Sequence, residues 1–136
     1  MGATEERGTV PISSEGDIAA ARKLVRNVAA AVGFGVTDVT RIVTAASELT
    51  RNVFRYAGSG VMRWHKIDSG TNIGIELIFE DHGPGIPDIQ QAMEAGYTTG
   101  GGLGLGLPGA KRLMDEIHVE SVIGQGTTVT VKKWRR

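Results

Sequence analysis

The sequence contains no cysteine among its 136 residues. Disulfide bonds and cysteine-bound metals are therefore excluded, and a reducing compartment fits this composition. The sequence also has no apolar run near the roughly 18 residues that a membrane-spanning helix needs, and its first residues lack the apolar core of a signal peptide. We therefore expect a soluble cytoplasmic protein without a membrane partner.

Net charge is absent too, because 15 basic and 15 acidic residues cancel. A neutral chain has no bulk electrostatic attraction to nucleic acid, so we expect no nucleic-acid partner. Basic residues concentrate only at the end of the chain, and we interpret this end as a solubilising edge strand or tail, made of Lys132, Lys133, Arg135 and Arg136.

The length of the chain suits one domain over residues 1–136. Several segments show the spacing of apolar residues that is typical of helices. Apolar residues at three- and four-residue intervals predict helices over residues 17–32 and 37–56. Ser13 or Ser14 would cap the first helix, and Thr37 the second. Shorter patterns predict helices over residues 87–94 and 107–116. Helices thus occupy the first third of the chain and two later segments.

Strand patterns fall around these helices. Residues 9–12 could form an edge strand, because Pro11 has no N–H to donate to a ladder. Residues 61–67 and 73–80 predict one hairpin, and residues 117–123 and 127–134 predict another. Helices gathered on one side of a mixed, mostly antiparallel sheet give an α+β fold, a two-layer sandwich.

Twenty glycines are present, far above the average usage of roughly 7%. They gather at DHGPGI (residues 81–86) and in TGGGLGLGLPG (residues 99–109). Free N–H groups of such a loop can bind an anion, and a helix beginning there, with Pro108 as its first residue, adds its positive end. We therefore predict a phosphate-binding loop. No strand leads into the G-x-G-x-x-G pattern at 104–109 and no P-loop lysine is present, so both common nucleotide folds are set aside.

Glu48 and Asn52 lie four residues apart and so share one face of the second predicted helix. Asn52 could offer an uncharged oxygen to Mg²⁺, while Glu48 could take the proton from an attacking hydroxyl in a phosphoryl transfer. A solvated face without chemical role is the alternative. Asp81 follows a strand, and it could either accept a hydrogen bond from an exocyclic amine such as that of adenine or simply bond N–H groups of the turn.

Four segments in this order, ELTRN (48–52), DHGPG (81–85), GGGLGLG (100–106) and GQGT (124–127), resemble the N, G1, G2 and G3 boxes of the Bergerat-fold ATPases. This GHKL superfamily includes gyrase, Hsp90, histidine kinases and MutL. Longer segments, residues 12–35, 44–58 and 80–116 with the terminal KKWRR, are similar to RsbT-type switch-protein serine kinases of the stressosome and general stress pathways.

The resemblance implies a site for ATP and Mg²⁺. Glu48 would be the general base, Asn52 the Mg²⁺ ligand and Asp81 the adenine-binding residue, and residues 88–102 would form a lid. Arg55 stands where histidine kinases of the superfamily have lysine, and its guanidinium could hold two phosphate oxygens. Further contacts to ATP are implied for Gly83, Gly85, Ile86, Thr98, Thr99, Gly102, Leu103, Gly104, Leu105, Gly106 and Thr127.

The resemblance also implies a function, namely ATP-dependent phosphorylation of serine on STAS-domain antagonist and stressosome scaffold proteins. The released kinase would then activate a PP2C-type phosphatase or another downstream regulator. Two alternatives stay open. One is an anti-sigma factor of the same superfamily, which sequesters a sigma factor, and the other is a pseudokinase that only binds nucleotide.

Overall fold

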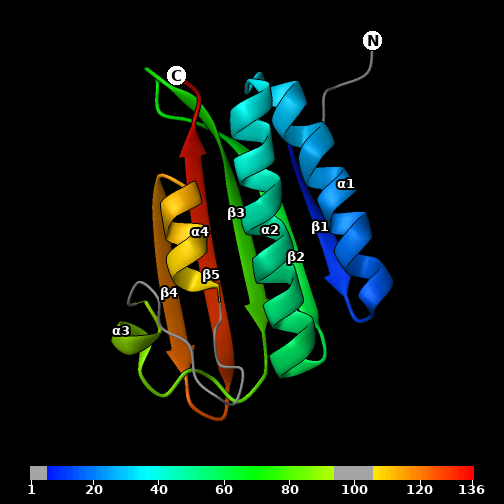
Figure 1. Ribbon diagram of the computed structural model, residues 1–136, viewed down its shortest axis with the longest axis vertical. Helices are drawn as coiled ribbons and strands as arrows, with labels where there is room; N and C mark the ends of the chain where they lie inside the picture. The colour runs from blue at the N-terminus through cyan, green and yellow to red at the C-terminus, as the bar shows by residue number, and fades with distance from the viewer. Residues whose placement is uncertain (1–5, 94–105) are drawn as a thin grey trace.

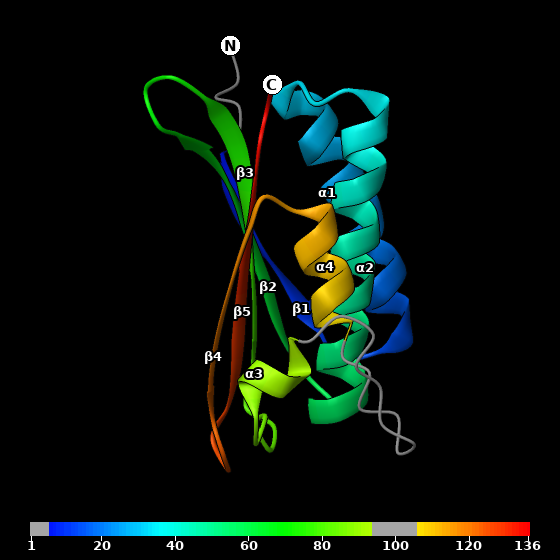
Figure 2. The ribbon, with the colours of Figure 1, turned by 60° about the vertical axis from the view of Figure 1, so that its left-hand side comes forward.

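One antiparallel sheet carries the fold, and helices cover one of its faces (Figures 1 and 2). The computed structural model describes residues 6–93 and 106–136, and within them five strands run in the order β1-β2-β3-β5-β4. All four ladders are antiparallel. The α+β sandwich and both hairpins are confirmed. The strands are β1 (Arg7–Ile12), β2 (Gly60–Asp68), β3 (Ile73–Asp81), β4 (Glu116–Val122) and β5 (Gly126–Trp134).

Two long helices, α1 (Glu15–Val32) and α2 (Val36–Ala57), lie side by side on the sheet. Their apolar stripes and one face of the strands form the core, which includes Val25, Leu49, Leu77, Phe79 and Val131. Gly33 ends α1 in the left-handed region, with φ of +107°, where glycine is favoured. No helix in the described residues is long and apolar enough to cross a membrane.

The start of α2 differs from the prediction. Gly35, and not Thr37, is the N-cap residue, and its carbonyl oxygen accepts the Val39 N–H at 2.9 Å. Thr37 already lies inside the first turn. The prediction from Thr37 was wrong because Gly35 takes the extended backbone conformation of an N-cap, with φ of −71° and ψ of 168°, so the helix begins two residues earlier.

Two short helices follow β3. The first, α3 (Ile89–Ala92), begins at Asp88, whose carboxylate accepts the Gln91 N–H at 2.9 Å. Its predicted end at residue 94 lies outside the described residues. The second, α4 (Leu107–Leu113), holds Pro108 as its second residue and not its first.

The predicted end of the last helix, at residue 116, was also wrong. Asp115 already donates its N–H to the Lys132 carbonyl at 2.9 Å, and Glu116 begins β4. The ammonium of Lys133 donates to the Leu113 carbonyl at 2.8 Å and so satisfies the last turn of α4. Pairing with β5 therefore stops α4 after seven residues.

The interpretation of the basic end as an edge strand was wrong as well, and only Arg135 and Arg136 form an exposed end beyond β5. β5 is an inner strand between β3 and β4, and Lys133 is only 5% exposed. Its ammonium lies 3.9 Å from Asp38 and 3.8 Å from Asp115. A charge-rich strand can be internal here because carboxylates of α2 and of the α4–β4 turn surround the one lysine that points inward.

Candidate active site

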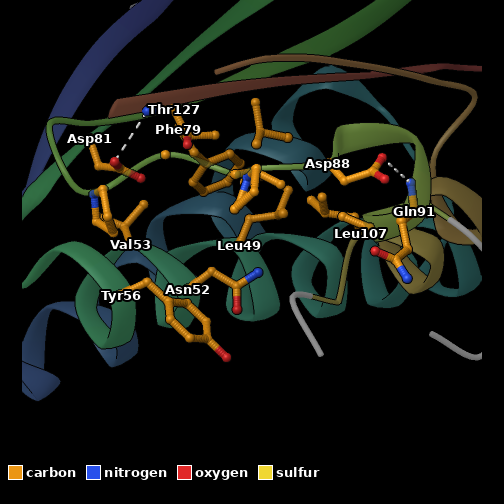
Figure 3. Close-up of a pocket in the computed structure, with 16 residues that line it drawn as sticks. Leu49, Asn52, Val53, Tyr56, Phe79, Asp81, Asp88, Gln91, Leu107 and Thr127 are labelled. Carbon is orange, nitrogen blue, oxygen red and sulfur yellow. Dashed lines mark hydrogen bonds between the residues drawn. The ribbon is translucent and has the colours of Figure 1, made fainter. Parts of the chain in front are cut away.

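A cavity of about 230 Å³ lies between α2 and the end of the sheet where β3 stops (Figure 3). Its walls are mostly apolar, and polar side chains lie at its two ends. Asp81 and Thr127 occupy one end, while Asp88 and Gln91 occupy the other. The remaining walls come from Leu49, Asn52, Val53, Tyr56, Phe79, Pro84, Gly85, Ile86, Pro87, Ala92, Leu107 and Val129.

Asp81 stands in the last position of β3, opposite Thr127 of β5. One carboxylate oxygen, Oδ1, accepts the N–H of Gly83 at 2.9 Å and the N–H of Thr127 at 3.2 Å. The bonding of turn N–H groups that the sequence suggested is therefore present. It uses Oδ1, whereas no hydrogen bond to Oδ2 is found among the described residues. Asp81 can thus shape the loop and still offer an oxygen to a ligand.

The glycines of this loop let backbone segments pass close to one another. A Cβ atom on Gly83 would lie 2.7 Å from Cβ of Ala57 at the end of α2. At Gly85 a Cβ would lie 2.7 Å from the Val122 carbonyl oxygen, and φ is +83°. Gly126 has φ of +138°, and its Cβ would clash with the Asp81 carbonyl oxygen. Glycine is therefore required at these positions because segments of this chain pack closely against one another, whether or not a ligand is bound.

Glu48 and Asn52 project from α2 near the start of α4. Asn52 lines the cavity, and Glu48 lies beside Gly106, because a Cβ on Gly106 would be 3.3 Å from Glu48 Oε2. The other oxygen of Glu48 accepts a hydrogen bond from Arg51 at 2.9 Å, and both side chains are partly exposed. The carboxylate is thereby oriented and remains reachable from solvent.

The other predicted contacts are distributed unevenly. Gly85, Ile86 and Thr127 line the cavity, and Gly83 supports it through Asp81. Arg55 is exposed and does not line it. Six predicted contacts lie outside the described residues, namely Thr98, Thr99, Gly102, Leu103, Gly104 and Leu105. The predicted lid, residues 88–102, is described only as far as residue 93.

Sequence reasoning missed several residues of this site. Ser121 of β4 accepts the Ile86 N–H at 2.7 Å, and Arg51 holds Glu48. The hydroxyl of Tyr56, on the cavity wall, is buried and has no hydrogen-bond partner among the described residues. Arg51 could have been found from its three-residue spacing to Glu48. Ser121 could not, because only strand pairing brings it to the loop.

The cavity fits a flat ligand with polar edges. Apolar side chains of Leu49, Val53 and Phe79 can contact the faces of a ring, and Asp81 can accept from its edge. A purine base has these properties.

A family model described as histidine kinase-, DNA gyrase B- and HSP90-like ATPase matches residues 37–136. The chain belongs to this ATPase family. Serine/threonine-protein kinase RsbT of Bacillus subtilis strain 168 is 51% identical over 131 residues, which cover 96% of this chain and 98% of that protein. The anti-sigma F factor of Thermoanaerobacter sp. strain X514 is 35% identical over 120 residues, or 84% and 82% of the two chains.

Solved structures of other proteins show the same fold. A Mycobacterium tuberculosis protein with RsbU and RsbW domains aligns with a TM-score of 0.62 and 19% identity, over 98% of this chain and 34% of that one. The catalytic domain of the histidine kinase ThkA aligns with a TM-score of 0.54 and 17% identity, over 94% and 96%. The predicted resemblance, fold class and enzyme class, a protein serine/threonine kinase, are confirmed by the comparisons.

Proposed function

We propose that this chain transfers a phosphoryl group from ATP to serine on STAS-domain partner proteins. The observation that carries this proposal is the placement of Glu48 beside Gly106, one helical turn from Asn52, which lines the cavity. The 51% identity to a serine/threonine-protein kinase supports it independently. The partner class, an antagonist or stressosome scaffold, rests on the resemblance described above.

Different residues along the cavity would bind the adenine base and the magnesium ion. Asp81 would accept a hydrogen bond from the adenine amine, and the apolar walls would contact the ring. Asn52 would hold Mg²⁺ through its side-chain oxygen, since this ion takes oxygen ligands and is commonly shared with phosphates. Bound Mg-ATP supplies the transferable phosphoryl group with its charge partly neutralised.

Glu48 would act as general base. Its carboxylate would take the proton of the partner's serine hydroxyl as that oxygen forms its bond to phosphorus and the bond to ADP breaks. The ion pair with Arg51, at 2.9 Å, fixes Oε1 and leaves Oε2 on the side of Gly106. A partner serine must therefore approach where α2 and the start of α4 meet.

Phosphorylation would then change the partner's affinity. A phosphate brings roughly −1.5 to −2 charges near pH 7, which can disrupt an interface that accepted a neutral serine. The freed kinase would bind and activate a PP2C-type phosphatase or another regulator in the cytoplasm. The chain would thus act as a switch between two protein partners.

The test combines mass spectrometry with two variants. Wild type and Mg-ATP should produce phosphoserine on a STAS protein, and Glu48→Ala should lower the transfer rate at least 100-fold while ATP still binds. Asp81→Asn should lose both ATP binding and transfer. Normal transfer by Glu48→Ala would refute the general-base role.

Glu80→Ala is the matched control. Glu80 is also paired with an arginine, Arg63, at 3.0 Å. It follows Phe79, which lines the cavity, and successive strand residues point to opposite faces, so Glu80 points away from the cavity. Its loss should leave the transfer rate unchanged. An equal loss of rate in both variants would indicate a general effect of removing a carboxylate.

A second candidate function is sequestration of a sigma factor, with ATP as a conformational ligand. The 35% identity to an anti-sigma F factor favours it. A pull-down from the native cell distinguishes the two. Recovery of a sigma factor in place of STAS and phosphatase partners would refute the kinase switch.

A further inference from the structure

Three polar side chains form a row across the end of the sheet. Asp81 of β3 stands opposite Thr127 of β5, and Thr127 stands opposite Ser121 of β4. Asp81 and Thr127 line the cavity, while Ser121 lies behind Thr127 as seen from Asp81. The row therefore connects the proposed adenine end to a serine that has no role in the proposed function.

The Ser121 hydroxyl has three hydrogen-bonding neighbours. It accepts the Ile86 N–H at 2.7 Å, it donates to the Gly126 carbonyl at 3.2 Å, and it lies 2.8 Å from the Thr127 hydroxyl. A hydroxyl has one proton and two lone pairs. The Ser121 proton goes to the Gly126 carbonyl, and one Ser121 lone pair accepts the Ile86 N–H. Only the second lone pair is then left for the Thr127 hydroxyl. All three neighbours are satisfied together only if Thr127 donates its own proton to Ser121.

This arrangement determines what Thr127 offers to the cavity. Its proton is directed to Ser121, so the side toward the cavity carries only lone pairs. Three backbone N–H groups nearby are also used, those of Gly83 and Thr127 by Asp81 and that of Ile86 by Ser121. Asp81 is itself acceptor-only when ionised. This end of the cavity therefore presents acceptors.

We infer that Ser121 is a positioning residue that keeps the Thr127 hydroxyl an acceptor and thereby favours a base with an exocyclic amine over one with an oxo group. The inference rests on the proposed use of ATP. An amine at the purine 6-position donates to the two acceptors. An oxo group at that position, as in inosine triphosphate, would face the lone pairs of one acceptor. The neighbouring N1–H can donate to only one of the two acceptors, so the other stays unpaired, which is costly in a partly buried site.

The experiment measures dissociation constants of ATP and inosine triphosphate by calorimetry on the full chain. In wild type, ATP should bind more tightly. In Ser121→Ala the Thr127 proton loses its acceptor and can turn to the cavity, so the preference for ATP should fall roughly five- to tenfold. Ser121→Thr, which keeps the hydroxyl and suits a strand, should restore the preference.

The ratio of the two constants separates this role from simple support of the loop. Loss of the Ile86 contact alone would weaken the binding of ATP and of inosine triphosphate equally and leave the ratio of their dissociation constants unchanged. That result would overturn the inference. If Ser121 acts through Thr127, adding Ser121→Ala to Thr127→Val should change the ratio no further. A further fall would also overturn it.

A wild type that binds ATP and inosine triphosphate equally overturns the inference, whereas a wild type that binds no nucleotide refutes the proposed function itself. If Ser121→Ala does not fold, Ser121→Cys replaces it. A thiol bonds only weakly, so the same fall in the ratio is expected and an unchanged ratio counts against the inference.

Discussion

The two ends of the sheet are built in opposite ways. At the end with the cavity, β3 stops at Asp81 and β5 begins at Gly126, and the chain segments touch through glycines and short hydroxyl side chains. At the other end β5 finishes at Trp134, and the buried ammonium of the preceding residue, Lys133, lies near Asp38 and Asp115. Figure 1 shows both ends of β5.

The difference indicates where binding chemistry can be placed. At the lysine end the charged groups pair with one another. Arg135 also donates a hydrogen bond to the Val32 carbonyl, in the last turn of α1. At the cavity end, glycines let the backbone segments approach closely. The side-chain oxygens of Asp81 and Thr127 are there at the cavity wall. One end therefore holds the layers together, and the other is available for a ligand.

The largest effect is expected for Gly126→Ala at the cavity end. A Cβ there clashes with the Asp81 carbonyl, and φ of +138° is unfavourable for alanine. The free energy of unfolding should fall by about 3 kcal/mol, and ATP binding should be lost. Denaturant unfolding and calorimetry check this.

Gly109→Ala is the control for that substitution. Gly109 lies within α4, and in the described structure no atom lies within 4 Å of a Cβ built there. Alanine should be neutral or slightly stabilising in a helix. If both variants behaved alike, crowding of the backbone at the cavity end would not explain its glycines.

Lys133→Met should have the next largest effect and should not reach the cavity. It leaves Asp38 and Asp115 without the ammonium and removes the bond to Leu113. Because both carboxylates are partly exposed, the expected loss of stability is about 2 kcal/mol, below the usual cost of breaking a fully buried pair. Thermal unfolding measures the loss, and affinity for ATP should stay within roughly twofold of wild type.

The neighbouring Lys132→Met is the matched control. Lys132 is 36% exposed and lies 3.6 Å from Glu76, so its loss should change stability by less than about 0.5 kcal/mol. A tenfold loss of ATP affinity in Lys133→Met would show that the two ends are coupled and would break the comparison.

The smallest effect is expected at the start of α1, where Asp17 accepts the N–H groups of Ser13 and Ser14 at 2.7 and 3.0 Å. These bonds, the Ser13 contact first, lower the pKa of Asp17 below 3.8. The contribution to stability is therefore present above the unfolded-state pKa and is lost as pH falls through the lower folded-state pKa.

Asp17→Asn should accordingly lower the melting temperature slightly at pH 7. The difference from wild type should shrink as the pH is taken below about 4, where the carboxylate of the unfolded chain is protonated. Thermal scans across this range check the sign. A difference that grew toward low pH would contradict the assignment of the pKa shift to these bonds.

Local patterns predicted much of this molecule. The apolar stripe of α1, both hairpins and the edge position that Pro11 requires all follow from neighbouring residues, and all are present. The spacing of Glu48 and Asn52 likewise predicted a shared helix face. The polar role of Ser121 and the burial of Lys133 did not follow, because each depends on which strands pair.

By itself, the sequence determined the elements, the glycine-rich turns and the residue types available for phosphoryl transfer, since these depend on φ preferences and on repeats of two or 3.6 residues. Only the tertiary structure decided that β5 inserts between β3 and β4. That insertion aligns Asp81, Thr127 and Ser121 at one end and buries Lys133 at the other. Strand order is set by packing across the whole chain, which no local pattern encodes.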